Sequence, residues 1–291
     1  MERSLRAAGC FLLCFFFLLP FTHAQTSSGP DPLLSIPPRE WVVQTVSHEL
    51  AVLNNRNAPL RYRMRIVNAK GDQVRDVIES RDGTVARLVL RDGKPLTEEQ
   101  DKDEQQRLND MLKNPDGFAR HIKDTQSGKK IADQLIRLMP DAMIYTYTPG
   151  QPQTGKHPGQ TEIVIDYEPN PKFHPPSTTA EALTGLRGRA WIDSRSKQII
   201  RMEGNIFRSV NFGWGMLAHI YPGGTLSIEQ QDAGNGRWIF THFEQRISVR
   251  ALMVKTLNIK ADIDAWDFRP IPSMSYQDAI RMLLNTPLPT H

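Results

Sequence analysis

Residues 60–91 read LRYRMRIVNAKGDQVRDVIESRDGTVARLVLR, and their pattern sets the expected architecture. Apolar residues alternate with arginines from 60 to 67, which is typical of a strand with one buried face. A turn signal follows at 69–72. Arg81-Asp82-Gly83 joins two further strands, because Asp and Gly tolerate the positive φ that a tight hairpin needs. The segment therefore predicts a meander of three antiparallel strands.

Similar alternation returns after Asp141. The further strands that it predicts are 143–148, 161–168, 188–193, 198–203, 226–230, 238–243, 247–252 and 255–261. Proline-rich loops at 149–160 and 169–179 separate some of them. About ten short strands with few helices favour closure as an antiparallel half-open β-barrel or a strongly curved sheet.

Helical patterns flank and interrupt these strands. Apolar residues recur at spacings of three and four over 41–53, which predicts an N-terminal helix packed on the sheet. Residues 97–139 predict a helical insertion that covers one side, with Thr97 and Gln100 as a capping box and a break at 114–117. Pro140 is expected to end it, and Ser275 to cap a short last helix. The expected fold class is α+β.

The N-terminus reads MERSLRAAGCFLLCFFFLLPFTHA over residues 1–24. Two arginines, a short apolar run and small residues before a cut at Gln25 are typical of a secretory signal peptide. The run is shorter than the roughly 20 apolar residues that span a membrane. We expect an exported protein without a transmembrane span in its mature chain, periplasmic or else extracellular. A flexible tether at 25–38 would precede a single domain at 39–291.

Composition narrows the classes of function. Both cysteines lie in the leader, which leaves no thiol for disulfides, metal binding or redox chemistry in the mature chain. The net charge of +4 is mild, and no basic cluster is interleaved with aromatic residues, so nucleic acid is not an expected partner.

No catalytic, metal-binding or cofactor motif stands out. The eight histidines form no His-Glu-x-x-His pattern, and there is no Gly-x-Ser-x-Gly. Strand carboxylates could supply the pair that a glycosidase needs, although an amphipathic strand also places them toward solvent. These carboxylates are Asp166, Glu168, Asp193 and Glu203. We predict no catalytic residue, no metal and no cofactor.

The segment 210–218, VNFGWGMLA, is the strongest candidate for a binding site. Phe212, Trp214 and Met216 would share one face of an extended strand, either as core or as the wall of a cavity. Trp191, Ile200 and Met202 could belong to the same wall. Large apolar side chains that include Met suit an irregular aliphatic ligand.

The hairpin of Gly188-Arg189-Ala190-Trp191-Ile192-Asp193 and Ile200-Arg201-Met202-Glu203, within an exported cysteine-free meander, resembles a known superfamily. It is similar to the Lol-type periplasmic lipoprotein carriers (LolA/LolB-like) and the related lipid-binding and envelope-stress-sensing domains. The resemblance covers roughly 60–268, and the helical insertion departs from the small carriers. It implies an unclosed barrel with a helix-covered apolar cavity for acyl chains, and a role as chaperone in outer-membrane lipoprotein sorting.

The hypothesis that follows is a non-catalytic carrier of the cell envelope that binds a lipid acyl chain or a lipoprotein. Two alternatives stay open. One is an envelope-associated hydrolase that uses the strand carboxylates. The other is an interaction module that recruits an envelope protein by β-augmentation.

Overall fold

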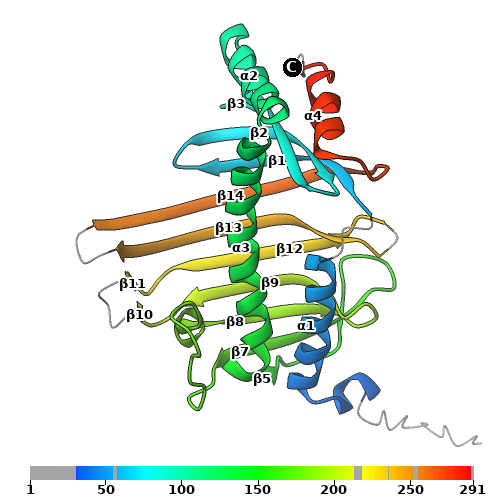
Figure 1. The fold of residues 1–291 in the computed structure, drawn as a ribbon. Coiled ribbons are helices and arrows are strands. Elements are labelled where there is room, and N and C mark those ends of the chain that lie inside the picture. Colours follow the sequence, from blue (N-terminus) through cyan, green and yellow to red (C-terminus); the bar gives the residue numbers. More distant parts are fainter. Residues whose placement is uncertain (1–30, 55–57, 213–217, 235, 252–254, 290–291) are drawn as a thin grey trace, which may run out of the picture.

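The computed structural model describes residues 31–54, 58–212, 218–234, 236–251 and 255–289 (Figure 1). Within these ranges the chain forms a fourteen-stranded antiparallel sheet with helices packed on it. The helices are η1 (Pro32–Ser35), α1 (Pro38–Asn54), α2 (Glu98–Lys113), α3 (Pro115–Ala142), η2 (Thr179–Gly185) and α4 (Tyr276–Leu284). None of these described helices is long and apolar enough to cross a membrane.

The strands form one continuous sheet. They are β1 (Leu60–Asn68), β2 (Gly71–Ser80), β3 (Gly83–Arg91), β4 (Lys94–Pro95), β5 (Met143–Tyr147), β6 (Gln153–Thr154), β7 (Thr161–Pro169), β8 (Leu186–Asp193), β9 (Ile199–Ile206), β10 (Val210–Phe212), β11 (Ala218–Ile220), β12 (Thr225–Asp232), β13 (Trp238–Ala251) and β14 (Lys255–Pro270). The main order is β4-β3-β2-β1-β14-β13-β12-β9-β8-β7-β5, and β4 and β5 do not pair with each other, so the sheet is open.

The expected fold class is confirmed: an α+β protein with an open, curved antiparallel sheet, an N-terminal helix and a helical insertion (Figure 1). The structure has more strands than the ten or so that alternation predicts, because two- and three-residue strands such as β6 and β10 are too short to show a period. Residues 238–251 form one strand instead of two, and α3 continues past Pro140 to Ala142.

The first and last strands lie side by side in the middle of the sheet. β1 pairs with β14, for example Ile66 with Ile263, although almost 200 residues separate them in sequence. The pairing joins the 60–91 meander, which forms as expected, to the strands that follow the insertion. A single sheet therefore runs under all the helices (Figure 1).

Helix α3 is anchored at its two ends. Its N-terminal part contributes Phe118 and Ile122 to a core with α2, α4, β2 and β3. Its C-terminal part contributes Leu135, Leu138 and Met139 to a core around Tyr167. A helix of 28 residues is about 42 Å long. The nine strands from β2 to β5 span about 38 Å at ordinary strand spacing, so one helix is long enough to cross them all (Figure 1).

Helix α1 lies beside the C-terminal part of α3 and packs on the sheet. Trp41 and Val42 form a core with Ile163, Ile165 and Ile192 of β7 and β8. The helix therefore covers β7 and β8, whereas β12, β13 and β14 contribute nothing to this core.

Candidate functional site

Strand register gathers apolar side chains on one face of the central sheet. Met202, Ile228, Phe243, Ile263 and Ile66 are successive cross-strand partners on β9, β12, β13, β14 and β1. Neighbours two residues away on these strands extend the row on the same face. We call the whole set the apolar trough; it comprises Met64, Ile66, Met202, Leu226, Ile228, Phe243, Ile247, Val249, Leu257, Ile259 and Ile263.

The apolar trough faces the helices. Met202 packs against the core that holds the C-terminal part of α3. Gln230, which follows Ile228 on the same face of β12, donates a hydrogen bond to Glu49 of α1 at 3.0 Å. Both contacts place α1 and α3 on the same side of the sheet as the trough.

The opposite face of the same strands is charged. Glu229, His242, Asp264 and Arg65 are successive cross-strand partners on β12, β13, β14 and β1. Because side chains alternate along a strand, this row lies immediately beside the apolar row but points away from the helices. The central sheet therefore has one solvated face and one apolar face.

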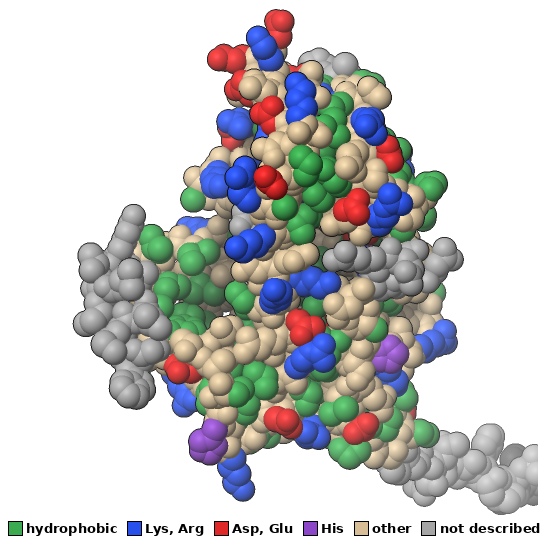
Figure 2. All heavy atoms as spheres, in the orientation of Figure 1, with side chains coloured by type: hydrophobic (Ala, Val, Ile, Leu, Met, Phe, Trp, Pro, Cys, Tyr) green, Lys and Arg blue, Asp and Glu red, His purple; other side chains and the backbone are tan. Residues whose placement is uncertain are grey.

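The helices do not bury the trough completely. No trough residue belongs to the fully buried core, and Leu257 and Ile259 are 40% and 42% exposed. The part of α3 between its two anchors, residues 123–130, reads KDTQSGKK and offers no large apolar side chain to the sheet. Figure 2 shows hydrophobic side chains gathered in a hollow beside α3. An apolar surface that a protein leaves incompletely covered is a candidate binding site.

A cavity of about 300 Å³ opens between α1, α3 and the sheet, next to the trough. Its apolar lining includes Val52 and Leu53 of α1, Ile136 of α3, and Trp238 and Phe240 of β13. Phe240 is 49% exposed, and this ring is close in sequence to Phe243 of the trough. The cavity shares no lining residue with the trough. It adjoins the trough, because Tyr62 and Gln230 of its lining lie two residues from Met64 and Ile228 on the same faces of β1 and β12.

Two polar pairs lie at the edge of this cavity. Glu49 accepts hydrogen bonds from the Ile199 backbone and from Gln230, both at 3.0 Å. Burial raises the pKa of Glu49, and the two hydrogen bonds oppose that rise. Glu79 pairs with Arg237 at 3.1 Å. These contacts tie α1 to β9 and β12 and hold the β12–β13 hairpin. The rest of the lining mixes the apolar side chains named above with polar ones, namely Ser80, Asp82, Thr84, Gln126 and Lys129.

Four of the six residues expected to line a cavity are described, and they do not all lie on one face of the sheet. Met202 belongs to the trough, and Ile200 is half-buried beside it at the β-bulge opposite Trp191 and Ile192. Trp191 lies on the charged face, since its neighbour Ala190 pairs with Met202, and its ring packs under Arg201 at 4.8 Å. Phe212 is half-buried in β10. Trp214 and Met216 lie outside the described residues.

Phe243, Ile263 and Ile66 were missed by sequence reasoning. Each belongs to a strand whose alternation could have flagged its apolar face. Alternation does not predict the order of the strands in the sheet. These three residues lie in one row only because β1 pairs with β14 and β14 pairs with β13.

Three of the four strand carboxylates that could serve a hydrolase are held by arginines or by a turn. Asp166 forms an ion pair with Arg189 at 2.6 Å, and Glu203 forms one with Arg201. Asp193 accepts hydrogen bonds from backbone groups of the turn that follows it. Glu168 lines an open groove of about 810 Å³ on the charged face together with Asp166 and Glu203. The contacts of Asp166, Asp193 and Glu203 account for these three carboxylates as parts of a solvated charged face.

Comparison with known proteins adds little. No family model matches the chain, and no curated protein matches it. A solved structure of a DUF1329 family protein from Desulfovibrio piger covers 84% of this chain and 96% of its own, at 10% identity and a TM-score of 0.29. A similarity at this level carries no functional argument.

Proposed function

We propose that this protein binds a long aliphatic chain of a lipid in the apolar trough and shields it from water. The observation that carries the proposal is the five-strand row from Met202 to Ile66, which the helices cover without burying. The trough residues on the sheet are aliphatic apart from Phe243, whereas residues 123–130 of α3 are polar. An aliphatic surface of this kind suits an acyl chain better than a polar metabolite.

The energetics of such binding need no specific polar contact. Each methylene removed from water contributes about 0.8 kcal/mol. Ten buried methylenes would contribute about 8 kcal/mol, which corresponds to a Kd near 1 μM before the cost of ordering the chain. The trough spans five strands, or about 19 Å at ordinary strand spacing, which gives an extended chain a long apolar path.

The setting is the cell envelope. The predicted signal peptide would export the chain, and the resemblance of the 188–203 hairpin to the Lol-type carriers implies the same kind of ligand. In this proposal the protein is a carrier or chaperone and performs no chemistry on the lipid. The helix α3 holds the space over the trough open because both of its ends are anchored.

A pair of variants on β14 tests the proposal. Ile259→Asp places a carboxylate in the trough, whereas Asn258→Asp adds the same charge on the opposite face one residue away. Both positions are exposed, and an aspartate at 258 can still accept the hydrogen bond from Ser248, so both variants should fold. Displacement of a fluorescent fatty acid should show at least tenfold weaker binding for Ile259→Asp, because a charge must be desolvated beside the chain.

The control should bind like the unmodified protein. Equal binding by both variants would place the ligand elsewhere, and no binding by the unmodified protein would remove the proposal. Circular dichroism and thermal unfolding of both variants establish that any loss of binding is not a loss of fold.

A further inference from the structure

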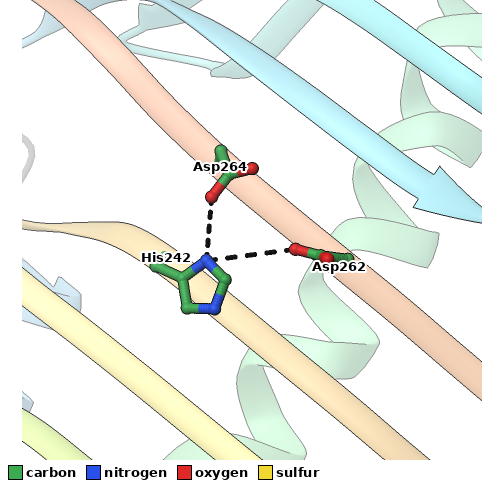
Figure 3. Close-up of side chains that lie close together, drawn as sticks. All are labelled: His242, Asp262 and Asp264. Atoms are coloured by element: carbon green, nitrogen blue, oxygen red, sulfur yellow. Dashed lines mark hydrogen bonds and ion pairs between the residues drawn. The ribbon is translucent and has the colours of Figure 1, made fainter.

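A histidine and two aspartates meet on the charged face of the sheet, on the opposite side from the apolar trough. His242 of β13 is the direct cross-strand partner of Asp264 on β14, and Asp262 is its diagonal neighbour. Figure 3 shows both carboxylates directed toward the imidazole. His242 Nδ1 lies 2.8 Å from Asp264 Oδ1 and 3.9 Å from Asp262 Oδ1.

The cluster has an excess of acceptors. Among the described residues no donor hydrogen-bonds to Asp262 Oδ1, although that atom is shielded from solvent. The Asp262 side chain as a whole is 39% exposed, so this atom is the shielded oxygen of a partly solvated carboxylate. A shielded oxygen without a donor still leaves room for a proton, a water molecule or a cation. This is an observation about Asp262 alone, independent of the proximity of the three side chains.

The nearby arginines are engaged by other carboxylates. Arg65, the β1 neighbour of Asp264, donates three hydrogen bonds to Asp72. Arg246 forms an ion pair with Glu244. Arg65 still attracts Asp262 and Asp264 at longer range, but His242 is the described side chain that contacts both directly.

We propose that His242, Asp262 and Asp264 bind a divalent transition-metal ion. Nitrogen and oxygen ligands lie about 2.0–2.2 Å from Zn²⁺, so two ligands of one ion can be at most about 4.4 Å apart. Both distances from His242 Nδ1 meet that limit, and the three ligand atoms all lie within 4.8 Å of one another. Small side-chain rotations would therefore complete the site without a change in the backbone.

The chemistry of the imidazole is consistent with this role. A metal at Nδ1 requires a neutral ring with its hydrogen on Nε2. His242 Nε2 lies 4.0 Å from Glu244 Oε2, which places an acceptor on the side where that hydrogen would point. One imidazole and two carboxylates suit Zn²⁺ and similar ions, whereas Mg²⁺ prefers oxygen ligands alone.

The experiment is a calorimetric titration of the full chain with ZnCl₂ after treatment with a chelator. We expect one Zn²⁺ per chain, and at least tenfold weaker binding for His242→Ala and for Asp262→Asn. His157→Ala is the matched control, because His157 lies in an exposed loop and should leave binding unchanged. Asparagine has nearly the same shape as aspartate, so Asp262→Asn should fold. It therefore tests the proposal even if His242→Ala is unstable.

The spectrum of Co²⁺ bound to the same protein gives a second readout, since a nitrogen ligand changes its visible absorption. Three results would each overturn the proposal. The first is that His242→Ala binds Zn²⁺ as tightly as the unmodified protein does. The others are that the protein binds Zn²⁺ no more tightly than Mg²⁺, or that it shows no stoichiometric binding of Zn²⁺. Lipid binding should be the same with and without Zn²⁺, because the trough lies on the other face of the sheet.

Discussion

Two glycines make room for the hydroxyl group of Tyr167 close to the sheet backbone. Gly188 and Gly204 are cross-strand partners on β8 and β9, and the Tyr167 hydroxyl lies over them and donates to the Glu203 carbonyl at 2.8 Å. A Cβ at Gly188 would come within 1.9 Å of that carbonyl oxygen and 2.6 Å of the hydroxyl. The absence of a side chain there lets Tyr167 join the core that anchors α3.

Gly188→Ala should therefore destabilise the protein. Backbone atoms must move to admit the methyl group, and overpacking of this kind costs about 1–3 kcal/mol. Gly117→Ala is the control, because nothing lies within 4 Å of its Cβ position in α3, and it should stabilise by about 0.5–1 kcal/mol. Urea unfolding measures both; a neutral Gly188→Ala would mean that Tyr167 does not require this close approach.

Glu49 should make stability depend on pH. Burial raises the pKa of its carboxyl above the ordinary 4.5, so its contribution to folding is fully present below that value. The contribution is lost as pH rises through the folded-state pKa. The free energy of unfolding should fall more between about pH 5 and pH 8 in the unmodified protein than in Glu49→Gln, which cannot ionise. An identical fall in both proteins would contradict this assignment.

Sequence reasoning correctly predicted the caps and turns of the elements, because these features depend on residues that are close together in the chain. The Thr97 capping box, the break at Asn114, the turn at Asp82-Gly83 and the Ser275 cap all form as expected. Each depends on residues within four positions of one another. The separate strands expected at 238–243 and 247–252 were wrong, because pairing with β14 continues through Gln245 and Arg246 and makes one strand, Trp238–Ala251.

A break in the middle of α3 should weaken lipid binding, because α3 would no longer form one continuous helix across the sheet. Ser127→Pro removes a backbone hydrogen bond and introduces a clash, at a cost of about 3 kcal/mol. The substitution leaves the residues of both anchoring cores of α3 unchanged. Any loss of lipid binding would therefore result from the loss of a continuous helix over the trough. Ser127→Ala should keep both helicity and binding. Full lipid binding by Ser127→Pro would show that α3 does not have to be continuous.

Across the whole molecule, sequence reasoning reached the class of the fold but not the site. Alternation predicts which side of each strand is apolar, and the number and spacing of the strands favour a half-open barrel or a strongly curved sheet. It does not place residue 66 beside residue 263, nor Trp191 on the opposite face from Met202, because those relations depend on strand order and register. The apolar trough exists only after these long-range pairings form.

The central claim is that the trough between α3 and the sheet holds a lipid chain. The most direct test is mass spectrometry of an organic extract of the protein, purified from the exported fraction without detergent, beside a heat-denatured control. We expect an aliphatic lipid in near-stoichiometric amount, and much less from Ile259→Asp. An extract with no lipid above the control, from protein that also fails to take up added fatty acid, would contradict the claim.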